Sequence, residues 1–421
     1  MPLKGDERLV QETVLLGKDG NLTLPKSVLS KLGLSDSNNV KLIINGEYIE
    51  ILPNIHSLSK VYIEPTTKCN LRCTTCIRNT WSETMGEMKI EVFNSLIEQL
   101  KKFKNLQTIM FGGFGEPTYH SEILYMIKKA KSIGVRVEMT TNGTLLSEKF
   151  IKGLFESQLD TLWVSFDGTD SEKFDEVRKG ANFVSIMDRL QILKKISNLY
   201  DHEIELGIAF VAMKSNVKEL GNLHKLIRKV EAKKVSISNV LPYDKEMQKE
   251  ILYESVVSDD ILFPSHMKTD IRIPRFDYNN TTKDSLHLLY RCNGNINPMG
   301  NRNNNYERSC KFIKERCTFI RWDGKVAPCM GLLHSYLTYS HDYERNIEAY
   351  TLGHISEAKL IDIWNSEEYS MFRDSVDKFN FSPCQTCGGC DNLKSNKEDC
   401  FGSRAPVCGA CLWAHGVIQC P

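Results

Sequence analysis

Thiols whose spacing could bind a metal lie in the segment TTKCNLRCTTCIRN, at Cys69, Cys73 and Cys76. Three and then two residues separate them, so a single loop can present all three sulfurs. Three thiolates can hold three irons of a 4Fe–4S cluster and leave the fourth iron open to a substrate. A zinc site that takes its fourth ligand from elsewhere in the chain is the alternative, because thiolate zinc is also common in reducing compartments. The spacing alone leaves both interpretations open.

The remaining cysteines of the fourteen lie far along the chain. Four are scattered at Cys292, Cys310, Cys317 and Cys329, and seven crowd between residues 384 and 420. A reducing cytosol discourages structural disulfides, so this many cysteines favour metal or redox roles.

Composition and length set the frame for these sites. With 421 residues, 41% apolar and 25% charged, the chain is typical of a globular protein of two or three domains. A net charge of +1 gives no reason to expect nucleic acid or a membrane surface as the main partner. No apolar run approaches the roughly 20 residues that span a bilayer, and the first residues do not resemble a secretory signal. We therefore expect a cytoplasmic protein without a membrane partner.

The cysteine-free stretch between the two groups predicts the elements that position the first one. Short β-branched or aromatic runs alternate there with segments of helical period, which indicates parallel βα units. Six such units predict an α/β fold, a partial (β/α)6 TIM-like barrel, in which functional residues lie at the carboxyl ends of the strands. The expected strands cover 61–64, 108–111, 135–140, 161–166, 206–212 and 234–238. The three cysteines follow the first of them.

This C-x3-C-x2-C spacing after a first βα strand resembles the radical S-adenosylmethionine (SAM) superfamily. The resemblance implies that Cys69, Cys73 and Cys76 bind a 4Fe–4S cluster whose open iron is chelated by SAM. It also implies reductive cleavage of SAM to a 5′-deoxyadenosyl radical, with electrons from a donor such as ferredoxin or flavodoxin.

The following strand ends carry further matches, in FGGFGEP, TTNGT and VSFDG, and DEVRKGANF supplies Arg178, which the resemblance places near the SAM carboxylate. The resemblance implies that Glu116 receives the SAM amino group and that Ser165 and Asp167 contact the ribose. Each signal alone also fits a turn or a helix cap, but their succession at four strand ends favours a SAM site. The implied SAM-binding residues are Gly112, Gly113, Glu116, Asn142, Ser165, Asp167 and Arg178.

The C-terminal third, with CKFIKERCTFIRWDGKVAPC and CQTCGGC, resembles the SPASM extension of radical SAM maturases. That resemblance implies two auxiliary 4Fe–4S clusters, the first on Cys310, Cys317 and Cys329 with a fourth ligand from the C-terminal group. Two zinc ribbons are the alternative. The metal ligands expected in the C-terminal group are Cys384, Cys387, Cys390, Cys400, Cys408, Cys411 and Cys420, with Cys390 and Cys400 unassigned to a particular cluster.

The first 55 residues are similar to an AbrB/SpoVT-type module, with a strand, a proline-started helix and a hairpin at Asn45-Gly46. Such modules dimerise and bind DNA in regulators, but the near-neutral charge favours docking or homodimerisation here. We thus expect three domains: 1–55, a radical SAM barrel over 56–285 and a SPASM domain over 286–421.

Together these features predict an enzyme, a SPASM-type radical SAM maturase that modifies a peptide, a protein or a protein-bound cofactor. The segments RWDGKVAPCM and CGACLWAHGVIQCP, with the AbrB-like start, resemble maturases associated with tungsten-containing aldehyde ferredoxin oxidoreductases. Modification of a ribosomal peptide, by a thioether or a carbon–carbon crosslink, is the alternative within enzymes. A DNA-binding iron–sulfur regulator is the non-enzyme alternative, and it would not need the strand-end residues.

Overall fold

The computed structural model describes residues 22–31, 40–45, 48–253, 270–273, 276–291, 295–298, 310–340, 343–382, 391–403 and 406–421. Its central feature is one sheet whose order is β10-β9-β8-β7-β6-β5-β4-β3-β11-β12-β15. Strands β3 to β10 follow one another in sequence and pair in parallel throughout. This arrangement confirms the predicted α/β class with a parallel sheet.

The six predicted strands are β3 to β8, and two short strands extend the sheet beyond them. β9 and β10 lie between residues 270 and 298, beyond the last of the predicted strands. The parallel strands are β3 (Lys60–Ile63), β4 (Thr108–Phe111), β5 (Arg136–Thr141), β6 (Thr161–Ser165), β7 (Glu205–Ala212), β8 (Lys234–Asn239), β9 (Asp270–Ile273) and β10 (Asn295–Pro298).

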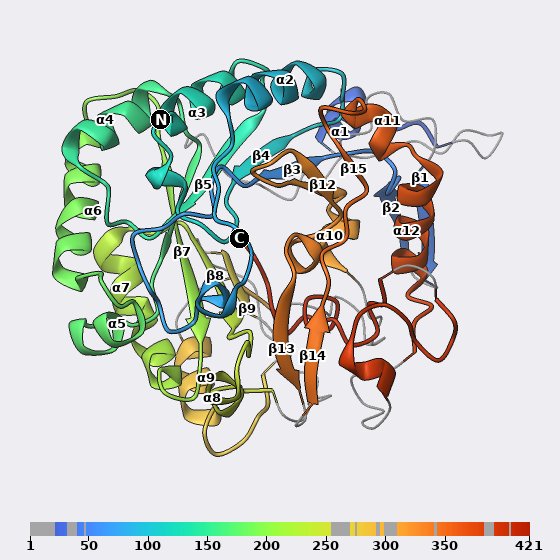
Figure 1. Ribbon diagram of the computed structural model, residues 1–421. Helices are drawn as coiled ribbons and strands as arrows, with labels where there is room; N and C mark the ends of the chain where they lie inside the picture. Colours follow the sequence, from blue (N-terminus) through green and yellow to red (C-terminus); the bar gives the residue numbers. More distant parts are fainter. Residues whose placement is uncertain are drawn as a thin grey trace.

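Amphipathic helices cover the outer side of these strands (Figure 1). In α2 the residues Phe93, Ile97 and Leu100 are fully buried, as their helical spacing predicts. The helices are α1 (Lys26–Lys31), α2 (Ile90–Leu100), α3 (Ile123–Lys131), α4 (Glu148–Glu156), α5 (Ser171–Val177), α6 (Phe183–Ser197), α7 (Leu223–Val230), α8 (Lys245–Lys249), α9 (Lys283–Arg291), α10 (Lys311–Lys314), α11 (Leu360–Trp364) and α12 (Glu367–Lys378).

The C-terminal region continues the same sheet. β11 (Cys317–Ile320) pairs in parallel with β3, and β12 (Lys325–Ala327) and β15 (Gly353–His354) follow antiparallel. β13 (Tyr336–Ser340) and β14 (Tyr343–Ile347) form a separate antiparallel hairpin, drawn below β12 in Figure 1. The chain end returns to the barrel, where the Tyr62 hydroxyl donates to the carbonyl of Pro421 at 2.9 Å. The C-terminal region is therefore built onto the first barrel strand.

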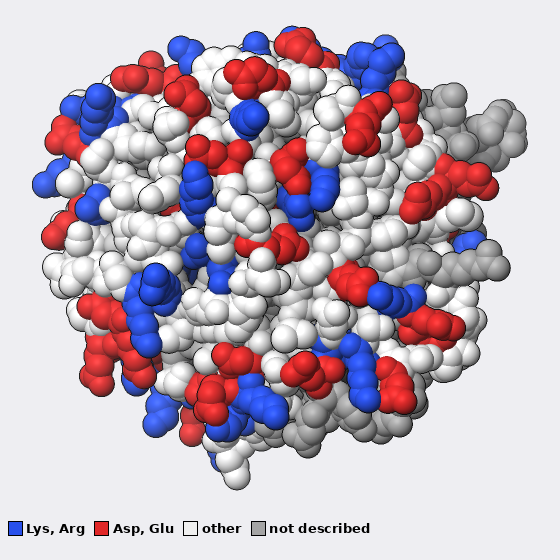
Figure 2. All heavy atoms as spheres, viewed as in Figure 1, with Lys and Arg blue, Asp and Glu red and all other residues white. Residues whose placement is uncertain are grey.

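The N-terminal region contains α1 and an antiparallel hairpin of β1 (Val40–Asn45) and β2 (Tyr48–Pro53), in which Asn45 faces Tyr48. Its identification as an AbrB/SpoVT-like module stays a prediction, as do the three domain boundaries. No helix in the described ranges combines the length and the apolar character that crossing a bilayer would need. Figure 2 shows cationic and anionic side chains interspersed over one face of the molecule.

Candidate active site at the carboxyl ends of the parallel strands

The cysteine loop begins directly after β3 and is fixed to the segment that follows α5. The backbone N–H of Thr74 donates to the carbonyl of Val177 at 2.8 Å, and that of Arg72 donates to Lys179 at 3.1 Å. The side chain of Arg78 adds hydrogen bonds to the carbonyls of Leu71 and Thr67. These contacts give the loop one defined conformation.

Two of the three sulfurs accept hydrogen bonds from the protein. The N–H of Leu71 lies 3.4 Å from Cys69 Sγ, and Arg78 Nε lies 3.3 Å from Cys76 Sγ. Burial raises the pKa of Cys69, and it raises the pKa of Cys73 to about 11 although Arg178 acts in the opposite direction. Buried thiols of this kind become thiolates when a metal supplies the compensating charge, and hydrogen bonds to sulfur are typical of iron–sulfur ligands.

The glycine-rich loop after β4 lies against the start of the cysteine loop. A Cβ on Gly115 would lie 2.0 Å from the carbonyl oxygen of Thr66, so only glycine fits this approach. Gly113 has φ +147°, a conformation that side chains rarely adopt, and a Cβ there would lie 2.6 Å from Glu64 Cγ. The backbone of Glu116 then donates to the carbonyl of Lys68 at 2.9 Å.

The Glu116 carboxylate connects the second strand end to the third. It is buried and accepts from the hydroxyls of Thr118 and Thr141, at 2.6 and 2.7 Å, and from the N–H of Asn142 at 2.6 Å. Burial raises its pKa, although these hydrogen bonds act in the opposite direction. The side chain of Asn142 points back to the cysteine loop, with Nδ2 at 3.7 Å from Cys69 Sγ and 3.0 Å from Asn70 Oδ1.

Asp167 and Arg178 form a buried ion pair at the fourth strand end, with Asp167 Oδ2 at 3.0 Å from Arg178 Nη2. Asp167 is fully buried and also accepts from the N–H of Val211, and burial raises its pKa. Within the described ranges, Arg178 Nε is buried without a hydrogen-bond partner. A buried cationic donor without a partner is suited to bind an anionic group of a ligand, such as a carboxylate. Ser165 is the last residue of β6 and is half-buried.

The structure brings Cys69, Glu116, Asn142, Asp167 and Arg178 together at the carboxyl ends of the strands. Despite burial, the pKa of Arg178 is raised by the charges of Asp167, Cys73, Glu116 and Cys69. The side chains that follow β3, β4, β5 and β6 therefore act on one another, as the strand-end rule predicts.

Two residues near this site were not singled out from the sequence. Glu64, which follows β3 directly, accepts from the N–H of Phe114 through Oε1 at 3.1 Å. Arg78 lies two residues after Cys76 and binds its sulfur. The signal for Glu64 was its place at a strand end, and the signal for Arg78 was a cation beside a thiolate cluster; both are weak alone.

The described C-terminal cysteines gather in a different way. Burial raises the pKa values of Cys310, Cys329 and Cys408. The charges of neighbouring cysteines, Cys411 among them, raise each of these pKa values further. A cavity of about 40 Å³ is lined by Cys329, Cys408 and Cys411. Neighbouring backbone N–H groups act in the opposite direction and lower the pKa values of Cys310, Cys329 and Cys411, a surrounding that also fits iron–sulfur ligation. We call these four residues the C-terminal thiol quartet.

The other predicted ligands are not part of this quartet. Cys317 is the first residue of β11, opposite Lys60 of β3, and burial raises its pKa, to which the charge of Cys310 adds. Cys420 is half-buried, and Cys400 is exposed. Among the described residues, no three His, Cys, Asp or Glu side chains are arranged to hold a single metal ion. Cys384, Cys387 and Cys390 lie outside the described residues, as does Cys292.

Comparison with protein-family models gives two matches. The Radical SAM superfamily matches residues 63–202, which include the cysteine loop and the following strand ends. SPASM, an iron–sulfur cluster-binding domain, matches residues 310–391.

Similar proteins cover most of the chain. The chain is 28% identical over 373 residues to a tungsten-containing aldehyde ferredoxin oxidoreductase cofactor-modifying protein of Pyrococcus furiosus, which covers 86% of this chain and 96% of that protein. It is 26% identical to a cysteine-type anaerobic sulfatase-maturating enzyme of Clostridium novyi, over 82% of this chain and 90% of that one.

Solved structures show the same fold. Native anSMEcpe with bound S-adenosylmethionine has a TM-score of 0.55 at 18% identity and covers 85% of this chain and 95% of its own. SuiB of Streptococcus suis bound to S-adenosylmethionine has a TM-score of 0.53 at 16% identity and covers 79% of this chain and 71% of its own.

Proposed function

We propose that this chain modifies the cofactor of a tungsten-containing aldehyde ferredoxin oxidoreductase. It carries a radical SAM domain and a C-terminal SPASM domain and is an enzyme of the radical SAM maturase family. The domains imply a 4Fe–4S cluster with SAM, and auxiliary iron–sulfur clusters. The observation that carries the proposal is the single loop of three thiols, against which the next strand ends are packed.

In this proposal Cys69, Cys73 and Cys76 hold the SAM-binding cluster, and the hydrogen bonds from Leu71 and Arg78 stabilise two of the thiolates. When bound, the cluster and SAM supply a 5′-deoxyadenosyl radical that can abstract a hydrogen atom from the substrate. The barrel excludes water and oxygen around that chemistry and orients the reactants.

The remaining strand-end residues bind and orient SAM. The orphaned Nε of Arg178 is available to the SAM carboxylate. Asp167, expected at the ribose, is fully buried and in this proposal holds the guanidinium in place instead. Gly112, Gly113 and Glu116 shape the loop for the SAM amino group, and Ser165 lies at the strand end expected near the ribose. Asn142 orients Cys69 from the third strand end.

The length of the similarity supports the tungsten-enzyme substrate. The match covers 96% of the Pyrococcus furiosus protein, so nearly its whole length has a counterpart here. The C-terminal thiol quartet, with cysteines outside the described residues, provides ligands for auxiliary clusters. A ferredoxin or flavodoxin is the expected one-electron donor.

Modification of a peptide or protein side chain is the second candidate. It is favoured by the match to a sulfatase-maturating enzyme over 82% of this chain. The two candidates share the SAM site and differ only in the substrate.

The activity is tested with anaerobically purified protein, dithionite and SAM. We expect 5′-deoxyadenosine from the wild type and none from Cys76→Ala, while Cys400→Ala, which removes an exposed thiol, retains the product. Formation of 5′-deoxyadenosine by Cys76→Ala at the wild-type rate would contradict the proposed cluster site.

The substrate is tested by co-expression with a tungsten-containing aldehyde ferredoxin oxidoreductase. We expect a mass change in the extracted cofactor that depends on Cys76, and deuterium transfer from the cofactor into 5′-deoxyadenosine. An unchanged cofactor, with label transferred instead from a cysteine-containing peptide, would favour the second candidate.

A further inference from the structure

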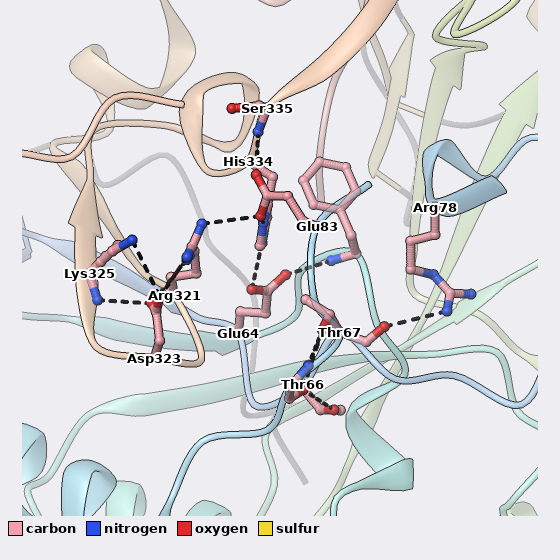
Figure 3. Close-up of polar contacts among 12 residues, drawn as sticks. Glu64, Thr66, Thr67, Arg78, Glu83, Arg321, Asp323, Lys325, His334 and Ser335 are labelled. Atoms are coloured by element: carbon pink, nitrogen blue, oxygen red, sulfur yellow. Dashed lines mark hydrogen bonds and ion pairs between the residues drawn. The ribbon is translucent and has the colours of Figure 1, made fainter. Parts of the chain in front are cut away.

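A buried histidine of the C-terminal domain lies between two glutamates of the barrel region. His334 follows η4 (Met330–Leu332), within the residues matched by the SPASM model, and its side chain is 1% exposed. Its Nε2 lies 2.8 Å from Glu64 Oε2, and its Nδ1 lies 2.7 Å from Glu83 Oε2 (Figure 3). We call Glu64, His334 and Glu83 the interdomain trio.

The geometry favours the charged form of His334. A neutral imidazole donates from one nitrogen only, whereas both nitrogens here face carboxylate oxygens. Burial opposes the charge, but the hydrogen bonds to Glu64 and Glu83 outweigh it and raise the pKa of His334. Burial also opposes the charge on Glu83, and the hydrogen bonds from His334 and the Ser335 N–H outweigh it and lower the pKa of Glu83.

The charges of the groups around the His334 ring sum to zero only when His334 is protonated. Arg321 lies 3.2 Å from Glu83 and also pairs with Asp323, which Lys325 approaches at 3.8 Å. Three carboxylates thus face two permanent cations and the imidazole. The titratable and charged groups of this network are Glu64, Glu83, Arg321, Asp323, Lys325 and His334 (Figure 3).

Glu64 connects this network to the glycine-rich loop. While Oε2 accepts from His334, Oε1 accepts from the N–H of Phe114. A Cβ on Gly113 would lie 2.7 Å from Glu64 Oε1, so the carboxylate contacts the turn of the loop directly. The Phe114 ring lies edge-on to His334 with centroids 5.8 Å apart, and Trp81 covers the ring at 4.5 Å. A shift of Glu64 must therefore move the loop.

We propose that His334 is a positioning residue, through which the C-terminal domain sets the conformation of the glycine-rich loop by holding Glu64. The inference rests on the proposed function, which assigns this loop to the SAM amino group. It adds that SAM binding depends on a residue of the other domain, which ligates no metal.

The dependence on pH follows from the sign of the shift. A histidine whose pKa is raised by folding contributes its full stabilisation below the ordinary value of about 6.5, and loses it as the pH rises through the raised pKa. Neutral His334 leaves one carboxylate without its hydrogen bond, so the loop loses its position at high pH. SAM affinity is expected to fall as the pH rises, by about 10-fold if the coupling is of ordinary size.

The experiment measures the dissociation constant of radiolabelled SAM by anaerobic equilibrium dialysis of the reconstituted protein, from pH 6 to pH 9. His334→Gln places a non-titrating amide in the trio, so we expect weaker SAM binding at pH 6 and a flatter profile, with unchanged iron content. Glu83→Gln keeps the histidine but removes the negative charge of Glu83, which raises the pKa of His334. We therefore expect the SAM-affinity profile of this variant to move to lower pH. The titration of SAM itself is common to all variants, so the differences between profiles isolate the trio.

His56→Gln is the matched control. His56 also joins the two regions, with Nε2 at 3.1 Å from Asp374 and Nδ1 at 3.0 Å from Arg373, but it does not contact the loop. We expect a wild-type SAM profile from it. A His334→Gln profile identical to that of the wild type would overturn this inference alone, while 5′-deoxyadenosine formation stays intact. Wild-type protein that binds no SAM at any pH would overturn the proposed function and this inference together.

Discussion

The cysteines of the barrel come from one loop, whereas the described cysteines of the C-terminal region come from positions spread between 310 and 420. Parallel strands fix the first site, because their carboxyl ends meet at one edge and each following loop adds a group there. The C-terminal thiol quartet instead combines Cys310 and Cys329 with Cys408 and Cys411 through the return of the chain end. A regular fold therefore specifies one thiol site locally, and long-range packing specifies the other.

The largest expected effect separates the two sites. Cys73→Ala should lower 5′-deoxyadenosine formation by more than about 100-fold, because loss of a direct ligand exceeds the 10- to 100-fold cost typical of outer-shell partners. Cys329→Ala should retain SAM cleavage within a few-fold and lose activity on the substrate. Product analysis by liquid chromatography measures both. Equal loss of SAM cleavage in the two variants would mean that the sites do not function separately.

The second prediction concerns which cysteines bind iron in the C-terminal site. Cys411→Ala should remove about four irons per chain, the content of one cubane cluster. Cys317→Ala should retain them, since this residue begins β11 and lies outside the quartet, and Cys400→Ala should do so as an exposed control. Iron assay and Mössbauer spectroscopy report the loss. If Cys317→Ala loses iron as Cys411→Ala does, Cys317 is a ligand, as the grouping with Cys310 and Cys329 implied by the SPASM resemblance predicts.

The sequence was most informative where a local rule applied. The buried runs predicted β3 to β8, and the strand-end rule predicted that Glu116, Asn142 and Asp167 would join the cysteine loop. The hydrophobic period of the segments and their order along the chain were sufficient to predict this part of the site. Each βα unit places the residues at its strand end next to those of the preceding unit.

Contacts between distant segments could not be predicted in the same way. β11 joins β3 across more than two hundred residues, and nothing in CTFI distinguishes that pairing from others. His334 meets Glu64 only because this pairing brings the C-terminal domain onto the barrel. β9 is held by pairing with β8, and β10 by pairing with β9, although their own sequences carry little strand signal.

Alanine substitution at two glycines tests whether each thiol site depends on a close backbone contact near it. A Cβ on Gly115 would lie 2.0 Å from the Thr66 carbonyl, and a Cβ on Gly409 would lie 2.0 Å from the Ser382 carbonyl. Each alanine variant should lower the free energy of unfolding by about 3 kcal/mol, the upper range for overpacking. Gly115→Ala should also weaken SAM binding, and Gly409→Ala should instead reduce C-terminal iron.

Gly134→Ala provides the control for these two variants. Its φ is +83°, but a Cβ there meets nothing within 4 Å, so only the backbone strain of about 1 kcal/mol remains. Anaerobic urea unfolding measures all three. A loss of C-terminal iron from Gly115→Ala, at unchanged SAM affinity, would contradict the separation of the sites.

The smallest expected effect concerns the influence of the third strand end on the reduction potential of the cluster in the barrel site. Asn142→Ala removes an amide 3.7 Å from Cys69 Sγ while leaving the three ligands in place. Because hydrogen bonds to sulfur raise the potential of an iron–sulfur cluster, the potential should become more negative. The electron donor should then reduce the cluster less completely, so SAM cleavage should slow by about 10-fold. Potentiometric titration followed by EPR measures the first, and Asn198→Ala, an exposed change at the end of α6, is the control. A potential unchanged by Asn142→Ala would restrict the role of this residue to the shape of its loop, and the third strand end would then contribute geometry to the barrel site without tuning its electrons.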